Sequence, residues 1–284
     1  MYRFFAPLLL LLVVGTLCEA EAAAIKAVVG IAPYCAFVKR IGGDYVEAIA
    51  VVPAGVSSHS YEPTSRQILE ATKADIWFTL GEPFEKKALQ AITSYRNHLL
   101  IIDLRQGIEL IGSCCHASCH TTSADPHIWL VPPLVKIQAK LIATALSTIA
   151  PTHKKFFEDN FNALAAELDA LDAKIHAVTD NLSNRTFLTA HPSYSYFASH
   201  YALTQLSLEV EGRDPSAQQL SQLLQQARAA HIRLIFVQPQ HPSKGAKLIA
   251  QQLQAHLISL DPYAEDYFGA MEAFLVALHT QDLS

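Results

Sequence analysis

The stretch 152–182 carries a helical pattern that no glycine or proline interrupts. Its apolar residues recur every three or four positions, which places them on one face of a helix. A helix of that length spans roughly 45 Å, about the length of a whole domain. We therefore predict one long helix that links everything before it to everything after it. The predicted apolar face consists of Phe156, Phe157, Phe161, Leu164, Leu168, Leu171, Ile175 and Val178.

On both sides of this helix, short apolar runs alternate with amphipathic segments. Such alternation indicates parallel strands joined by helical crossovers. The sequence thus predicts an α/β protein of two lobes, 25–151 and 183–284, each a mainly parallel sheet flanked by helices, with a cleft between them. The expected strands are 27–30, 46–52, 75–80 and 98–104 in the first lobe, and 187–190, 203–210, 234–237 and 256–260 in the second.

Residues 1–24 have the features of a signal peptide. Arg3 precedes an apolar run at 8–14, and Ala20-Glu21-Ala22 is typical of a cleavage site. An alternative is lipid attachment at Cys18, although Gly15-Thr16-Leu17 matches that processing signal poorly. No later segment resembles a membrane span, so we expect an exported, periplasmic or extracytoplasmic protein.

The charge distribution argues against nucleic acid as a partner. The formal net charge is −5, and the sequence contains no basic block. Apolar residues make up 51% of the chain, which is enough for a sizeable core.

Three histidines and one carboxylate follow predicted strands, two in each lobe. His59 and His127 come from the first lobe, and His191 and Asp261 come from the second. Open α/β sheets bind ligands outside the carboxyl ends of their strands. Three imidazoles and one carboxylate suit Zn²⁺, with affinity expected to fall as the pH drops through roughly 6.5.

Other polar residues near these strand ends are weaker candidates. Glu62, Glu209 and Glu211 are candidate partners of the ligands. His241 follows the strand 234–237 and can approach the cleft, but the simpler interpretation is a polar loop residue.

A cysteine- and histidine-rich loop precedes His127. It contains Cys114, Cys115, His116, Cys119 and His120. One interpretation is a disulfide between Cys119 and either Cys114 or Cys115, which an exported compartment permits. The other is an accessory site in which thiolates and imidazoles capture metal and pass it inward.

Two further classes of function remain open on these residues. One is an exported metal-dependent hydrolase that uses the same histidines, although the sequence contains no HExxH, GxSxG or P-loop motif. A fourth protein ligand would also close the position that a catalytic zinc keeps open for water. The other is a surface adhesin in which the metal is only a structural staple.

Five segments together resemble the periplasmic solute-binding receptors that supply zinc or manganese to ABC transporters. They are VPAGVSSHSYEPTSRQ (52–67), ADPHIWLVP (124–132), TAHPSYSYFASHYAL (189–203), EGRDPSAQQL (211–220) and ISLDPYAEDYF (258–268). The resemblance covers residues 25 to 280. It implies two lobes joined by a rigid helix, metal ligation by His59, His127, His191 and Asp261, and delivery by a monomer to a membrane permease with its ATPase.

The chain departs from this family pattern in three places. Ser57-Ser58 stands where the family usually has Asp-Pro before its first histidine. The loop before His127 is short and cysteine-rich rather than rich in histidines and acids. Manganese-specific members usually carry Glu where this chain has His191, a softer donor that favours zinc without excluding Mn²⁺.

Overall fold

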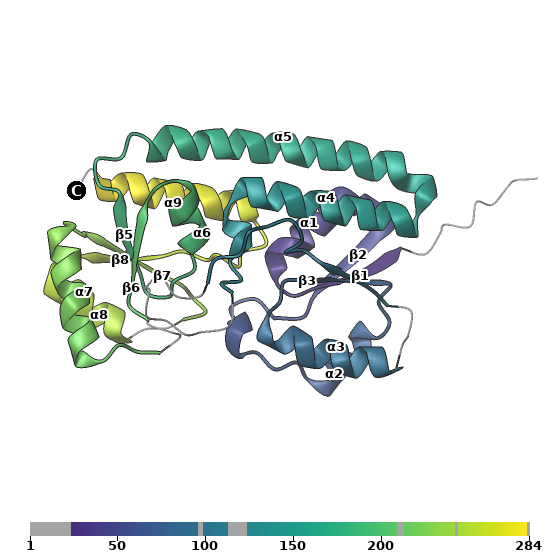
Figure 1. Ribbon diagram of the computed structural model, residues 1–284, viewed down its shortest axis with the longest axis horizontal. Helices are drawn as coiled ribbons and strands as arrows, with labels where there is room; N and C mark the ends of the chain where they lie inside the picture. The colour runs from purple at the N-terminus through teal and green to yellow at the C-terminus, as the bar shows by residue number, and fades with distance from the viewer. Residues whose placement is uncertain (1–23, 96–98, 113–123, 210–212, 242–243, 283–284) are drawn as a thin grey trace, which may run out of the picture.

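The computed structural model describes residues 24–95, 99–112, 124–209, 213–241 and 244–282. Two α/β lobes lie side by side beneath one long helix, α5 (Lys154–Thr179) (Figure 1). The α/β fold predicted from the sequence is confirmed. Several predicted features lie outside the described residues. They are the signal peptide with Cys18, of which only Ala24 is described, then Glu211, and the loop that contains Cys114, Cys115, His116, Cys119 and His120.

Each lobe contains a four-stranded parallel sheet. The first sheet has the order β2-β1-β3-β4, and the second repeats it as β6-β5-β7-β8. The strands are β1 (Ile25–Val29), β2 (Val46–Ala50), β3 (Ile76–Thr79), β4 (Leu100–Asp103), β5 (Thr186–Thr189), β6 (Thr204–Ser207), β7 (Leu234–Val237) and β8 (His256–Ser259). Because every strand is parallel to its neighbours, the loops that follow the strands gather at one edge of each sheet.

Helices connect and cover the strands, as parallel pairing requires. They are α1 (Ala32–Gly42), α2 (Ser65–Ala71), α3 (Pro83–Tyr95), α4 (Pro132–Ile149), α6 (Ser195–His200), α7 (Ala217–Ala229), α8 (Lys244–Leu253) and α9 (Tyr267–Asp282). Capping boxes begin α2 and α7: Thr64 and Ser216 each accept a hydrogen bond from the backbone N–H three residues on. In the described part of the chain, no helix has both the length and the apolar character needed to cross a bilayer.

Helix α5 is slightly shorter than predicted because a 3-10 turn, Pro151–His153, precedes it. It packs on α1 and α4 in the first lobe and on α9 in the second (Figure 1). Its buried face includes Leu164, Leu168, Leu171 and Ile175. The sequence assigned Phe156 to this face, but Phe156 is exposed and contacts Tyr45 at the surface.

Aromatic side chains join the two lobes directly. The Trp129 indole N–H donates to the carbonyl oxygen of Pro262 at 2.8 Å, and its ring lies 5.3 Å from that of Tyr263. Phe37 of α1 packs edge-on against Tyr267 of α9, with ring centroids 5.0 Å apart. Buried residues of both lobes and of α5 form one continuous apolar cluster. This interface holds the lobes in a defined relation to each other.

The packing of α5 leads to a first prediction. Leu168→Ala removes a side chain that is 1% exposed between α5 and the core, so we expect a loss of about 2–5 kcal/mol in the free energy of unfolding. The same substitution at Leu248, which is 49% exposed on α8, should cost no more than about 0.5 kcal/mol. Urea unfolding followed by circular dichroism measures both. Equal losses in the two variants would contradict the packing described for α5.

Candidate metal centre

The four expected ligands all lie in loops after strands. His59 is on a 3-10 turn, Ser58–Ser60, beyond β2. His127 precedes another such turn, Ile128–Leu130, beyond β4. In the second lobe, His191 follows β5 and Asp261 follows β8. The strand ends of both lobes therefore face a common region.

The three imidazoles converge between the lobes. Nε2 of His59 lies 3.2 Å from Nε2 of His127 and also 3.2 Å from Nε2 of His191. The rings of His127 and His191 are 5.3 Å apart. Both of these side chains are at least nine-tenths buried, whereas that of His59 is 26% exposed. Three ring nitrogens from two lobes thus meet at a point that solvent reaches past His59.

A carboxylate lies beside the other nitrogen of each converging ring. Nδ1 of His127 is 2.7 Å from Asp125, and Nδ1 of His191 is 2.7 Å from Glu209. Nδ1 of His59 is 3.3 Å from Glu82. A carboxylate at Nδ1 fixes the ring orientation and directs the Nε2 lone pair outward, the arrangement usual for metal-ligating histidines. The three side chains are therefore oriented to act as Nε2 ligands.

Ser58 orients the carboxylate behind His59. Its buried hydroxyl donates to Oε1 of Glu82 at 2.7 Å and lies 3.2 Å from the hydroxyl of Tyr263. Ser58 occupies the place where the resembling receptors usually have a proline. In this chain that position ties the His59 loop to Glu82 and to the opposite lobe.

The buried amide of Gln238 clamps the backbone of His191. His191 donates its N–H to Oε1 of Gln238 at 3.2 Å, and Nε2 of Gln238 donates to the His191 carbonyl at 3.0 Å. Gln238 follows β7, and the same loop continues to Gln240 and His241. The loops that follow the neighbouring strands β5 and β7 are thereby held together.

Several contacts at this site were not found from the sequence. The sequence does not predict contacts by Glu82, Asp125, Gln238 or Gln240, and at His241 it favours a polar loop residue. The available signal was their position directly after predicted strands, which Glu82 and Gln238 share with the histidines. Conversely, the structure does not bring Glu62 to the site: its carboxylate is 78% exposed and pairs with Lys87 at 2.9 Å.

Asp261 lies at the predicted strand end but is held by neighbours. Its Oδ1 accepts hydrogen bonds from Nε2 of Gln240 at 2.6 Å and from the backbone N–H of Tyr263 at 2.8 Å. Its second oxygen takes part in none of the hydrogen bonds found among the described residues. Asp261 is thus fixed through one oxygen by residues of the loops that follow β7 and β8.

The protonation states favour a cation. Burial lowers the pKa of His191 to about 3 despite its bond to Glu209, so the ring is neutral at physiological pH. Burial also opposes the protonation of His59, but the hydrogen bond and charge of Glu82 outweigh it and raise the pKa of His59. Burial raises the pKa values of Glu82, Asp125 and Glu209, but the histidine beside each outweighs this effect, so all three pKa values end below their usual range. Three negative charges therefore surround the ring nitrogens.

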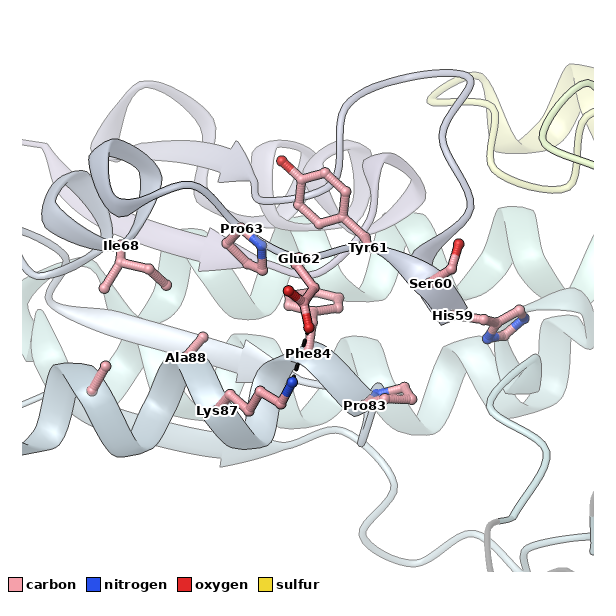
Figure 2. Close-up of a pocket in the computed structure, with 11 residues that line it drawn as sticks. His59, Ser60, Tyr61, Glu62, Pro63, Ile68, Pro83, Phe84, Lys87 and Ala88 are labelled. Carbon is pink, nitrogen blue, oxygen red and sulfur yellow. Dashed lines mark hydrogen bonds and ion pairs between the residues drawn. The ribbon is translucent and has the colours of Figure 1, made fainter.

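A pocket of about 320 Å³ lies beside the centre in the first lobe. Figure 2 shows His59 at one end of it, with the Glu62–Lys87 ion pair along its rim and Phe84 and Pro63 within. The lining is mainly apolar, and His59 is the only histidine among the described residues that form it. This pocket is an open approach to His59 rather than the metal centre itself.

Two α/β lobes on one rigid helix, with an imidazole cluster between them, define a receptor for a metal ion. A family model described as zinc-uptake complex component A, periplasmic, matches residues 27–281. The chain belongs to this family.

Individual relatives agree with that assignment. A crystal structure of ZnuA is 34% identical and superposes with a TM-score of 0.85 over 91% of this chain and 99% of that chain. A putative metal-binding protein of Chlamydia muridarum is 29% identical over 255 residues, covering 89% of this chain and 90% of the relative. The high-affinity zinc uptake system protein ZnuA of Bacillus subtilis is 26% identical, covering 78% and 73% respectively.

The contact between His59 and Glu82 predicts the pH dependence of metal binding. Protonated His59 cannot bind a cation, so affinity should fall as the pH drops through the raised pKa of His59. Glu82→Gln removes the charge that raises this pKa. We expect the pH midpoint of zinc binding to move to lower pH in this variant, with a loss of roughly 10–100-fold in affinity at pH 8.

Glu62→Gln is the matched control because Glu62 is an exposed carboxylate on the same loop. Competition with a chromogenic chelator between pH 5 and 8 measures all three proteins. A Glu82→Gln midpoint equal to that of the wild type would contradict the role assigned to Glu82.

Proposed function

We propose that this protein captures Zn²⁺ in the cleft between its lobes and delivers it to the membrane permease of an ABC transporter. His59, His127 and His191 bind through Nε2, and Asp261 is the fourth ligand. The convergence of three Nε2 atoms, each on a ring backed by its own carboxylate, is the observation that carries this proposal. Membership in the zinc-uptake family supports the identity of the cargo.

The donor set favours zinc over manganese. Imidazole suits Zn²⁺, whereas Mn²⁺ prefers carboxylate and water oxygens. The carboxylates nearest the centre are engaged by histidine Nδ1 atoms, so the inward-facing donors are nitrogens. Mn²⁺ therefore binds more weakly than Zn²⁺ in this proposal.

We further propose that the lobes, 25–151 and 183–284, move little when metal binds. Helix α5 and the contact between Trp129 and Pro262 oppose wide opening. Capture and release then depend on side chains in the loops, with the part-exposed His59 as the first contact for an incoming ion. The protein acts as a monomer outside the cytoplasm.

Removing the ligands tests the site. His127→Ala and His191→Ala should each lower zinc affinity by at least about 100-fold, since losing a ligand costs more than losing its hydrogen-bonding partner. His279→Ala, an exposed histidine at the end of α9, should bind as the wild type does. Calorimetry with Zn²⁺ and Mn²⁺ measures each protein. Unchanged affinity in His191→Ala would contradict the ligand set.

Removing the metal tests the receptor mechanism. The apolar cluster spans both lobes without any metal, so we expect the chelated protein to stay folded with native circular dichroism. Free Zn²⁺ at a hundred times its Kd should then stabilise it by about 2.7 kcal/mol through mass action. Outright unfolding on chelation would favour a structural staple over a delivery protein.

A further inference from the structure

The loop after β7 places a fourth histidine against the metal centre. The ring of His241 stacks on that of His191, with centroids 3.8 Å apart and planes 7° from parallel. It lies 6.1 Å from the ring of His59. The side chain is only 12% exposed. His241 is thus part of the same imidazole cluster.

One nitrogen of His241 lacks a partner within the described chain. Its Nε2 is buried and makes no hydrogen bond to any residue that the structure describes, while its Nδ1 lies 3.7 Å from Oε1 of Glu209. Leaving a buried ring nitrogen unsatisfied is unfavourable. An ion in the cleft would satisfy it.

The spacing suits a shared ion. His59, His191 and His241 each offer a ring nitrogen, and all three atoms lie within 4.8 Å of one another. Ligand nitrogens around zinc are roughly 3.3 Å apart when the bonds are 2.0–2.1 Å long and tetrahedral. Because the rings of His191 and His241 are stacked and nearly parallel, their lone pairs run side by side, so the His241 ring must rotate to direct its nitrogen at the ion.

Asp261, the fourth ligand in the proposed function, is held by neighbouring groups. Neither Asp261 nor His127 is part of this three-histidine group, although Nε2 of His127 lies 3.2 Å from Nε2 of His59. Gln240, the residue before His241, binds Oδ1 of Asp261 at 2.6 Å. One short loop therefore both retains Asp261 and presents His241.

Building on the proposed function, we propose that His241 is an alternate metal ligand that exchanges with Asp261 at the fourth coordination position. With His241 bound, the ion has four nitrogen donors, which favours Zn²⁺ over Mn²⁺. With Asp261 bound, it has three nitrogens and one oxygen. The exchange lets one ligand leave while another arrives, so the ion changes partners without becoming uncoordinated.

A double-mutant cycle tests this exchange. His241→Phe keeps a planar ring against His191 but removes the donor, and Asp261→Asn keeps the bonds to Gln240 and Tyr263 but removes the charge. Calorimetry with Zn²⁺ should give losses of about tenfold for each single variant. Because each ligand replaces the other, the double variant should lose on the order of tenfold more than the product of the single losses.

X-ray absorption at the zinc edge gives a second readout. We expect four imidazoles around zinc in Asp261→Asn and three in His241→Phe. His256→Phe is the matched control, since His256 is exposed at the opposite end of β8, and it should behave as the wild type. Circular dichroism of each metal-free variant verifies that the fold is retained.

The outcomes separate this inference from the proposed function. Two results together would overturn the role of His241. In calorimetry, His241→Phe would leave zinc affinity unchanged, both alone and when added to Asp261→Asn. In X-ray absorption, Asp261→Asn would show only three imidazoles around zinc. If His127→Ala also bound zinc normally, the cleft site itself would be wrong. If His127→Ala lost zinc binding while the His241 variants bound zinc as the wild type does, the proposed function would stand and His241 would have no part in it.

Discussion

The candidate metal centre depends on imidazole rings from two lobes, which are held close together with their Nε2 atoms facing inward. Two Nε2 lone pairs 3.2 Å apart gain nothing from each other, so the surrounding groups must hold the rings there. The buried Asp125 and Glu82 lie beside His127 and His59, and the part-buried Glu209 lies beside His191. Glu82 and Glu209 closely follow the ends of β3 and β6, as His191 follows β5, so the parallel sheets place both the proposed ligands and the carboxylates beside them.

Helix α5 and the lobe interface keep the two halves of this cluster in register. When the ligands of one site come from two lobes, binding is tighter if the folded protein already holds the lobes together, because the metal then does not have to bring them together. Trp129 contributes to holding them, because its indole bonds to Pro262 directly beside the ring of His127. In the proposed function, the metal therefore meets a largely preformed site, and small loop movements suffice for its release.

The sequence was sufficient for the architecture and for the histidines, but not for their surroundings. Strand ends are visible as apolar runs followed by polar residues, and His59, His127 and His191 stand out there. Partners such as Glu82 depend on which way a side chain points, and no periodicity determines that in a loop. The turn Ser58–Ser60 shows the effect: Glu62 follows His59 closely in the chain, yet His59 enters the centre and Glu62 pairs with Lys87 at the surface (Figure 2).

The placement of charge also explains how a nitrogen-rich site can hold a dication. Imidazoles are neutral, so four nitrogens alone would leave both charges of the ion uncompensated in a buried place. Glu82, Asp125 and Glu209 supply negative charge beside the Nδ1 atoms, on the side of each ring away from the centre, and the neighbouring histidines lower the pKa values of these carboxylates. One oxygen of each carboxylate lies beside a histidine Nδ1 atom, so ring nitrogens face the centre, rather than the oxygens that hard cations such as Mg²⁺ or Ca²⁺ require. The same pairs therefore attract a divalent ion and select for one that accepts nitrogen.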